Sequence, residues 1–224
     1  MQVDSGTVQV WSDIACPWAT VAMVRLYTAR DRLGLTSEVS VDHRAFPLEL
    51  LNEQATPRRI LDAEIPVVGR LAPDFGWSVW QGRAEEYPVT TLLALEAVQA
   101  AKEQGPRASE QVDMALRRAL FAESRCISIR AVVESAVRSC PDVDADALLQ
   151  LLDSGQARAA VTAQWQQAES DRIQGSPHLF LADGTSVHNP GITKHWVSQP
   201  GQGFPVVDED DPQVYDDLLR RAAT

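Results

Sequence analysis

Cys16 is the residue of this sequence best suited to covalent chemistry. It stands in the segment WSDIACPWA, residues 11–19, just before a stretch with helical spacing. The first N–H groups of a helix have no backbone partner and the helix dipole favours negative charge there, so a thiolate is stabilised at this position. Because the thiolate is the nucleophilic form of cysteine, we expect Cys16 to be reactive. The alternative is a buried, inert cysteine, which is common among free cysteines.

Three further side chains are candidates to support this thiol. Asp13 either tunes the site or caps the start of the helix. Trp18 either covers the thiol and shapes a docking surface, or packs as an ordinary core aromatic. His178 directly follows Pro177 and would lower the pKa of a nearby thiol, although strand alternation can instead turn its ring to the opposite face.

Strand and helix patterns on both sides of Cys16 must position it. Thr7–Ser12 has apolar residues at alternate positions, as a strand does, and residues 38–43 alternate in the same way. Between them, residues 17–33 have the spacing of a helix, and Gly34 suits its C-terminal cap. Proline is favoured at the first helical position because its missing N–H would have no partner there.

The middle of the chain predicts helices and almost no strands. The clearest helical stretches between about residues 56 and 172 are 89–102, 110–123, 129–138, 145–153 and 157–174. A strand-helix-strand unit and a later hairpin can share one sheet, with these helices packed to one side. We therefore predict an α/β protein with a discontinuous main domain, residues 1–54 and 173–224, and a helical insertion domain at 55–172.

The C-terminal part predicts a hairpin followed by mostly irregular structure. Residues 178–182 and 185–188 have strand patterns on either side of Asp183-Gly184, a strong turn signal. We expect a helix at 192–198 and a loop over 201–211, which contains Gly201-Gln202-Gly203 and an acidic run. A closing helix is expected at 212–223.

The charge and the cysteine count of the chain limit the classes of partner that we expect it to bind. The chain has 224 residues, a net charge of −11 and three cysteines. An acidic surface argues against nucleic acid and anionic membranes as main partners, and we expect neither a secretory signal nor a membrane-spanning helix. The cysteines have no metal-ligand spacing and are too few for a disulfide scaffold, so we expect no metal and a cytoplasmic, reduced protein. For the oligomeric state, a homodimer is an alternative to a monomer.

The segments described above resemble the DsbA-like thioredoxin family, in particular its FrnE-like branch. Residues 12–18, SDIACPW, are similar to the family's active-site segment, which typically reads Ser-Asp, two residues, then Cys-Pro-Trp-Cys. Residues 44–48, 119–127 and 168–180 are similar to other family segments, and the last carries the family's cis proline. The resemblance implies a thioredoxin-like fold with a helical insertion between its second and third strands, and a cis Ser176-Pro177 bond facing Cys16-Pro17-Trp18.

Ala19 stands where the family has its second active-site cysteine. A dithiol enzyme resolves its mixed disulfide with that second thiol, so intramolecular resolution at this site is lost. Resolution would need a small thiol, a partner protein, Cys126 or Cys140, and we interpret the last two as core or helix-end cysteines. The family often has Gly-Ala-Gln after the hairpin, whereas residues 188–191 read His-Asn-Pro-Gly.

Three functions follow as hypotheses. The first is a monothiol oxidoreductase or disulfide isomerase, in which Cys16 forms a mixed disulfide with a small thiol or a disulfide-bearing substrate. The second resembles the kappa-class glutathione transferases and hydroxychromene-carboxylate isomerases, which bind a low-molecular-weight thiol such as glutathione at this helix start. The third is a binding protein without catalysis. None of them requires a tightly bound cofactor.

Overall fold

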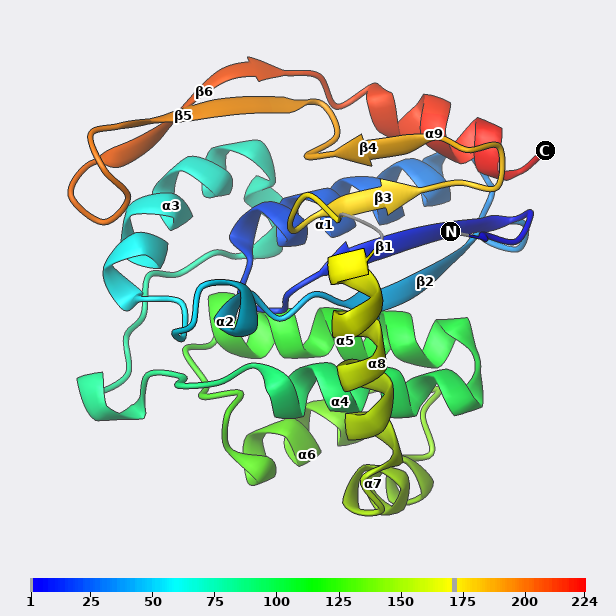
Figure 1. The fold of residues 1–224 in the computed structure, drawn as a ribbon, viewed down its shortest axis with the longest axis horizontal. Coiled ribbons are helices and arrows are strands. Elements are labelled where there is room, and N and C mark those ends of the chain that lie inside the picture. Colours follow the sequence, from blue (N-terminus) through cyan, green and yellow to red (C-terminus); the bar gives the residue numbers. More distant parts are fainter. Residues whose placement is uncertain (1, 171–172) are drawn as a thin grey trace.

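A four-stranded mixed sheet forms the centre of the computed structural model, which describes residues 2–170 and 173–224 (Figure 1). Its strands, in spatial order, are β2 (Ser40–Ala45), β1 (Thr7–Ser12), β3 (His178–Phe180) and β4 (Ser186–His188). β1 and β2 are parallel, so the chain between them must cross over, whereas β3 runs antiparallel to both β1 and β4. The predicted strand-helix-strand unit and the hairpin are therefore confirmed, and they share one sheet.

Two helices cover one face of this sheet. α1 (Pro17–Arg32) makes the crossover between β1 and β2, and α9 (Val214–Ala222) packs against α1 and β1. Alternate apolar residues of the strands face these helices, because side chains of a strand alternate between the two faces of a sheet. The buried core of this layer includes Val8, Val10, Met23, Leu26, Val41, Leu179, Tyr215 and Leu219.

The middle of the chain forms a second, helical core. Its longer helices are α4 (Leu92–Ala101), α5 (Pro106–Phe121), α6 (Arg130–Arg138), α7 (Ala145–Asp153) and α8 (Gln156–Ser170). Short helical segments connect the other parts: α2 (Leu48–Leu51), η1 (Pro73–Phe75), η2 (Ala84–Glu86) and η3 (Lys102–Gln104). The predicted helices are confirmed with shifted ends. The predicted stretch 157–174 also covers residues 171 and 172, which lie outside the described residues.

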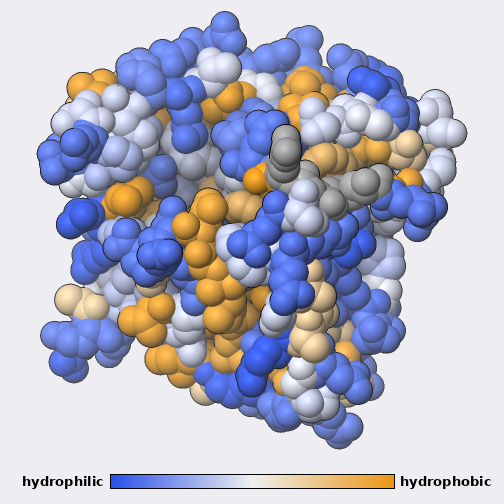
Figure 2. Space-filling view, in the orientation of Figure 1, coloured by the Kyte–Doolittle hydropathy of each residue, from blue (hydrophilic) through white to orange (hydrophobic). Residues whose placement is uncertain are grey.

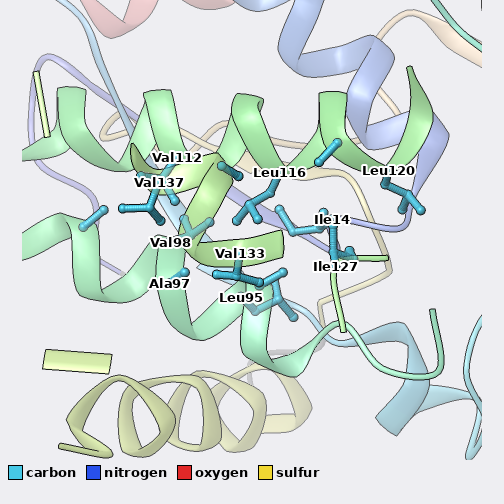
Figure 3. Close-up of a cluster of buried hydrophobic side chains, with 14 of the residues drawn as sticks. Ile14, Leu95, Ala97, Val98, Val112, Leu116, Leu120, Ile127, Val133 and Val137 are labelled. Atoms are coloured by element: carbon cyan, nitrogen blue, oxygen red, sulfur yellow. The ribbon is translucent and has the colours of Figure 1, made fainter. Parts of the chain in front are cut away.

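Ile14 ties this helical core to the turn that carries Cys16. Figure 3 shows Ile14 in one cluster with Leu116 of α5, Val98 of α4 and Val133 of α6, and all four side chains are buried. The chain just before α1 is thereby anchored in helices that are distant in sequence. Apolar burial of such side chains contributes about 1.5–3 kcal/mol each, so this anchor is strong.

Side chains from the helices form hydrogen bonds with the backbone N–H and C=O groups at the outer edge of β2. The Glu110 carboxylate accepts from Val41 N at 2.9 Å, and the Gln164 carbonyl accepts from Ala45 N at 2.7 Å. The Gln99 amide donates to the backbone oxygen of His43 at 3.2 Å. A buried strand edge would otherwise leave unpaired backbone groups, so these three polar side chains allow α4, α5 and α8 to pack directly on the sheet.

The C-terminal predictions for 192–198 and 201–211 are wrong. β5 (Ile192–Val197) and β6 (Phe204–Asp210) form an antiparallel hairpin that packs against α3 (Arg58–Leu71), as Figure 1 shows. The burial of β5 alternates with period two, which is a strand pattern that we interpreted as helical. At the acidic end of β6, Asp210 pairs with Arg25 of α1 at 2.6 Å and Asp208 contacts His195 of β5 at 2.8 Å. The pairing with α1 depends on the tertiary fold, so the sequence alone did not indicate it.

The face of the molecule in Figure 2 is largely hydrophilic, in keeping with the net charge of −11. Hydrophobic side chains gather in its lower half. Among the described residues, exposed large hydrophobic side chains include Leu50 and Leu51 of α2, Val89 and Ile129. No helix in the described part of the chain is long and apolar enough to cross a membrane.

Candidate active site

Cys16 is the N-cap residue of α1. Its backbone is extended, Pro17 opens the helix, and its Sγ accepts a hydrogen bond from Ala19 N at 3.4 Å. The thiol in turn donates to the backbone oxygen of Ser176 at 3.1 Å, and the Ser176-Pro177 peptide bond is cis. The first helix and the loop before β3 therefore meet at the sulfur, as the sequence predicted.

The environment of this sulfur is apolar. Cys16 is only 4% exposed and belongs to a cluster with Val68 and Ala72 near the end of α3 and Ile192 of β5. Burial raises the pKa of the Cys16 thiol to about 11. The Ser176 side chain and the hydrogen bond from Ala19 N lower this pKa and only partly oppose the effect of burial. The expected stabilised thiolate is therefore wrong for this structure. The helix end is present, but desolvation outweighs it.

Trp18 closes the cluster on one side. It is 5% exposed, and its Nε1 donates to the Glu64 carboxylate of α3 at 2.7 Å. Lys194 of β5 lies with its Nζ 4.5 Å from the centre of the indole ring, a cation–π contact. Burial raises the pKa of Glu64, while its hydrogen bond to Trp18 and the charge of Lys194 lower it. Trp18 thus joins α1 to α3 and to the hairpin that covers Cys16.

Asp13 organises the turn between β1 and α1. Its buried carboxylate accepts from Ala15 N at 2.8 Å, from Leu48 N at 2.7 Å and from the Thr91 hydroxyl at 3.1 Å. Burial raises the pKa of Asp13 to about 6 against these three hydrogen bonds. The carboxylate therefore caps the turn before the helix, and it links that turn to α2 and to the start of α4.

Ser176 fixes the opposite side of the site. Its hydroxyl accepts from Asp13 N at 2.9 Å, while its backbone oxygen accepts from the Cys16 thiol. Both hydrogen bonds cross from the loop before β3 to the turn before α1. Ser176 and Pro177 are therefore brought to Cys16 by contacts with two successive parts of that turn.

His178 makes its hydrogen bonds away from Cys16. Its Nδ1 accepts from Gln174 N at 3.1 Å, and its Nε2 bonds to the Ser186 hydroxyl at 2.9 Å. The ring lies 4.3 Å from that of Phe180, and burial lowers the pKa of His178 to about 4. A neutral histidine that connects β3 to β4 makes such contacts. His178 therefore follows the alternative in which strand alternation turns its ring away from Cys16.

The other two cysteines lie in the helical core. Cys126 and Cys140 are free and buried, and both belong to the cluster of α4 to α8 rather than to that of Cys16. Cys140 donates to the Ala136 backbone oxygen at 3.4 Å, and burial raises the pKa of Cys140 to about 11. Ala19 is fully buried at the position of the missing thiol. Among the described residues, no group of three or more His, Cys, Asp and Glu side chains could hold a metal ion.

Sequence reasoning missed two charged residues next to the site, Glu64 and Arg117. Arg117 of α5 is fully buried and pairs with Asp113 four residues earlier, at 2.7 Å. An Asp–Arg pair at this spacing, on a helix face where the neighbouring Leu116 and Leu120 are buried, is a signal that the sequence did contain. Glu64 lies on the buried face of α3, where a lone carboxylate needs a donor such as the Trp18 indole.

The site thus combines a thiol at the start of a helix with a cis proline loop beside it. A comparison of the sequence with models of protein families identifies one family. The model of the DSBA-like thioredoxin domain matches residues 7–195. This chain belongs to the DSBA-like thioredoxin domain family. The predicted thioredoxin-like α/β fold is thereby confirmed.

Solved structures of DsbA-like proteins have the same fold. A probable DsbA oxidoreductase from Streptomyces coelicolor is 22% identical, with a TM-score of 0.68, over 96% of this chain and 89% of the other. The cytosolic disulfide reductase DsbM from Pseudomonas aeruginosa is 16% identical, with a TM-score of 0.53, over 96% and 95%. A 2-hydroxychromene-2-carboxylate isomerase is 16% identical, with a TM-score of 0.59, over 81% and 87%. No curated protein sequence matches this chain.

Proposed function

We propose that this DSBA-like protein is a thiol-disulfide oxidoreductase or isomerase that acts with Cys16 alone. The observation that carries the proposal is the position of the Cys16 sulfur, which accepts from Ala19 N and donates to the Ser176 oxygen of the cis proline loop. In this position the sulfur is at the end of the α1 dipole, where a developing negative charge is favoured. Within the family, we infer the FrnE-like branch from residues 12–18.

The reaction needs one thiol of the protein and two partners. Cys16 loses its proton to solvent, and its sulfur attacks one sulfur of a substrate disulfide. The disulfide bond breaks, the second substrate sulfur leaves as a thiolate and takes up a proton, and Cys16 is left in a mixed disulfide. A second thiol then attacks this mixed disulfide, which returns Cys16 to the free thiol and creates a new disulfide.

The source of the second thiol decides the outcome. A thiol of the same client protein gives isomerisation, whereas a small thiol such as glutathione, or an equivalent, gives reduction or deglutathionylation. Ala19 offers no sulfur, and Cys126 and Cys140 belong to another core. We therefore infer an external thiol as co-substrate and no tightly bound cofactor. Such a thiol pool fits a cytoplasmic protein.

The side chains of α3 and β5 that cover Cys16 must move aside before a substrate disulfide can reach the sulfur. Cys16 is 4% exposed beneath α3 and the start of β5, while the neighbouring Ser176 is partly exposed. Displacement of the apolar cover hydrates the sulfur, which removes the cause of its raised pKa. We infer that the thiol is quiescent in the closed structure and becomes nucleophilic on encounter with its substrate.

A mixed-disulfide experiment tests this function. The reduced protein is incubated with oxidised glutathione and analysed by intact mass and peptide mapping, with Cys16→Ser as the matched control. We expect one glutathionyl group at Cys16, its removal by added reduced glutathione, and no addition to the control. A protein that takes no group at Cys16 under conditions that modify an exposed reference thiol would contradict the proposal.

One observation favours a second function, the binding of a low-molecular-weight thiol without disulfide exchange. With a pKa of about 11, Cys16 stays protonated at neutral pH and can donate a hydrogen bond, as a serine hydroxyl does. An enzyme of this kind would hold the thiol of glutathione against the start of α1. Calorimetric titration with S-methylglutathione separates the two functions, because this analogue cannot form a disulfide. Binding that survives in Cys16→Ser favours the second function.

A further inference from the structure

The guanidinium of Arg117 donates hydrogen bonds to both ends of the segment that carries Cys16, residues 12–20. One of its nitrogens donates to the Asp13 backbone oxygen at 3.0 Å and to the Thr20 hydroxyl at 3.1 Å. The other terminal nitrogen donates to the Ser12 hydroxyl at 2.9 Å. Arg117 belongs to α5, so an element distant in sequence holds the end of β1, the turn and the first turn of α1 together.

Two of these three acceptors, the Asp13 oxygen and the Thr20 hydroxyl, are in turn hydrogen-bonded to the backbone of Cys16. The Asp13 oxygen also accepts from Cys16 N at 3.3 Å, and the Thr20 hydroxyl donates to the Cys16 backbone oxygen at 3.2 Å. The Arg117 cation is therefore one hydrogen-bonded residue away from the backbone of Cys16 on both sides. The position of the guanidinium therefore constrains the backbone that carries the thiol.

The charges around Cys16 are arranged with opposite signs on two sides. Glu64 of α3 approaches from the side of the cover, and its negative charge raises the pKa of the Cys16 thiol. Arg117 approaches from beneath, and its positive charge lowers the pKa of the same thiol. Two further ionisable side chains lie close to this site: Lys194 of β5, which lies on the Trp18 ring, and the buried Asp13 carboxyl in the turn before α1.

Asp113 keeps the guanidinium charged inside the core. It accepts from Arg117 at 2.7 and 3.0 Å, and both side chains are almost completely buried. His43 of β2 has its Nδ1 3.6 Å from the Asp113 carboxylate, and this nitrogen has no hydrogen-bond partner in the described part of the chain. Burial lowers the pKa of His43 from 6.5, so it adds no charge at neutral pH. The pair therefore has its positive end at the Cys16 turn and its negative end away from it.

We propose that Arg117 is a positioning residue for Cys16, which fixes the turn before α1 and supplies the buried positive charge toward which the thiolate forms. This inference rests on the proposed role of Cys16 as the attacking thiol. Arg117 itself does not touch the reacting sulfur in the described contacts. It acts through Asp13, Thr20 and its field.

The test compares two double variants in the interface of α1, α5 and β2. Arg117→Met with Asp113→Asn removes the pair at the turn. Arg30→Met with Glu110→Gln removes a second buried pair, whose nitrogen and oxygen are 2.6 Å apart. Among the described residues, the other side-chain hydrogen bonds of this pair involve Val39, Val41 and Arg107 and not the turn before α1. The readout is the rate of Cys16 alkylation by iodoacetamide at pH 8, measured by peptide mass. Below its pKa a thiol reacts in proportion to its thiolate fraction.

We expect the Arg117 variant to react about three- to tenfold more slowly than the natural protein, because Arg117 lowers the Cys16 pKa and the positive end of the pair is the end at the Cys16 turn. The Arg30 variant should react at the natural rate or faster. A purely structural role has the opposite sign, because loosened packing exposes Cys16 and accelerates its alkylation. An unchanged or faster rate in the Arg117 variant would overturn the proposal.

Two conservative variants keep the test decisive. Arg117→Lys retains the charge, and we expect its alkylation rate to stay within about threefold of the natural rate. Thr20→Val has nearly the same shape and removes only the hydroxyl between Arg117 and Cys16, so it serves if the double variant does not fold. We expect it to react about two to three times more slowly, and no change would overturn the proposal.

The failure of this inference is distinguishable from the failure of the proposed function. If natural Cys16 takes a glutathionyl group but the Arg117 variants keep the natural alkylation rate, only the role of Arg117 is wrong. If the alkylation rates follow the expected order but Cys16 takes no glutathionyl group, the electrostatic role stands and the oxidoreductase function is wrong.

Discussion

Raising the pH should reveal how strongly burial holds the Cys16 proton. With a pKa of about 11 in the folded protein, about 0.1% of Cys16 is thiolate at pH 8. A thiol with the ordinary value of 9.0 would be about 10% ionised at the same pH. We therefore expect Cys16 to be alkylated about 100 times more slowly in the folded protein than in the chain unfolded in urea.

The sign of the pH dependence follows from the cause of the shift. Burial disfavours the charged form, so the thiolate fraction and the alkylation rate should rise about tenfold for each pH unit up to about pH 10. Iodoacetamide pulses at several pH values, followed by peptide mass analysis, give the rate for Cys16 separately from Cys126 and Cys140. A Cys16→Ser variant identifies the peptide.

Two results would refute this reasoning. A rate that reaches a plateau below about pH 8 would mean that the helix end and Arg117 outweigh desolvation, and that Cys16 is a stabilised thiolate even when covered. Equal rates in the folded and unfolded protein would mean that α3 and β5 do not cover the sulfur in solution.

Three further predictions concern the surroundings of Cys16. Asp13→Asn removes the carboxylate whose pKa burial raises from 3.8 to about 6, against three hydrogen bonds that lower it. Relative to this variant, which does not titrate at position 13, the natural protein should gain about 1–3 kcal/mol of unfolding free energy as the pH falls from about 7 to 4, because the folded state favours the protonated carboxyl. Urea unfolding of both proteins at several pH values measures this difference, and a constant difference would contradict the prediction. Gln164→Leu leaves the buried Ala45 N–H without its acceptor and should cost about 1–3 kcal/mol in the same assay, whereas an unchanged stability would mean that water reaches the strand edge. Ala19→Cys should form a disulfide with Cys16 on mild oxidation, seen as the loss of two hydrogen masses, and a persistent pair of free thiols would mean that position 19 cannot reach the sulfur.

Local patterns were sufficient to predict the elements that hold Cys16. Thr7–Ser12 and the helix from Pro17 follow directly from periodicity and from the preference of proline for the first helical position. The meeting of Cys16 with Ser176 was inferred from the resemblance to the family, since 160 residues separate them. The sequence also contained the alternation of Ile192–Val197, but its lysine, histidine and tryptophan side chains obscured it.

Local sequence patterns do not predict the environment of the Cys16 sulfur. Burial raises the pKa of Cys16, and the apolar cluster around it includes Val68 of α3, Ala72 directly after α3 and Ile192 of β5, which come together only in the folded chain. The role of Arg117 likewise depends on the packing of α5 beneath the turn. Desolvation and buried charge are properties of the tertiary structure, so sequence reasoning placed Cys16 at the start of the first helix but predicted the wrong direction for its pKa shift.

Trapping of the mixed disulfide at Cys16 tests the central claim most directly. The reduced protein and the Cys16→Ser variant are treated with oxidised glutathione, and the modified residue is located by peptide mass. The account predicts one glutathionyl group on Cys16, released by reduced glutathione, with Cys126 and Cys140 unmodified. A protein that is unmodified at Cys16, or modified equally at all three cysteines, would contradict it.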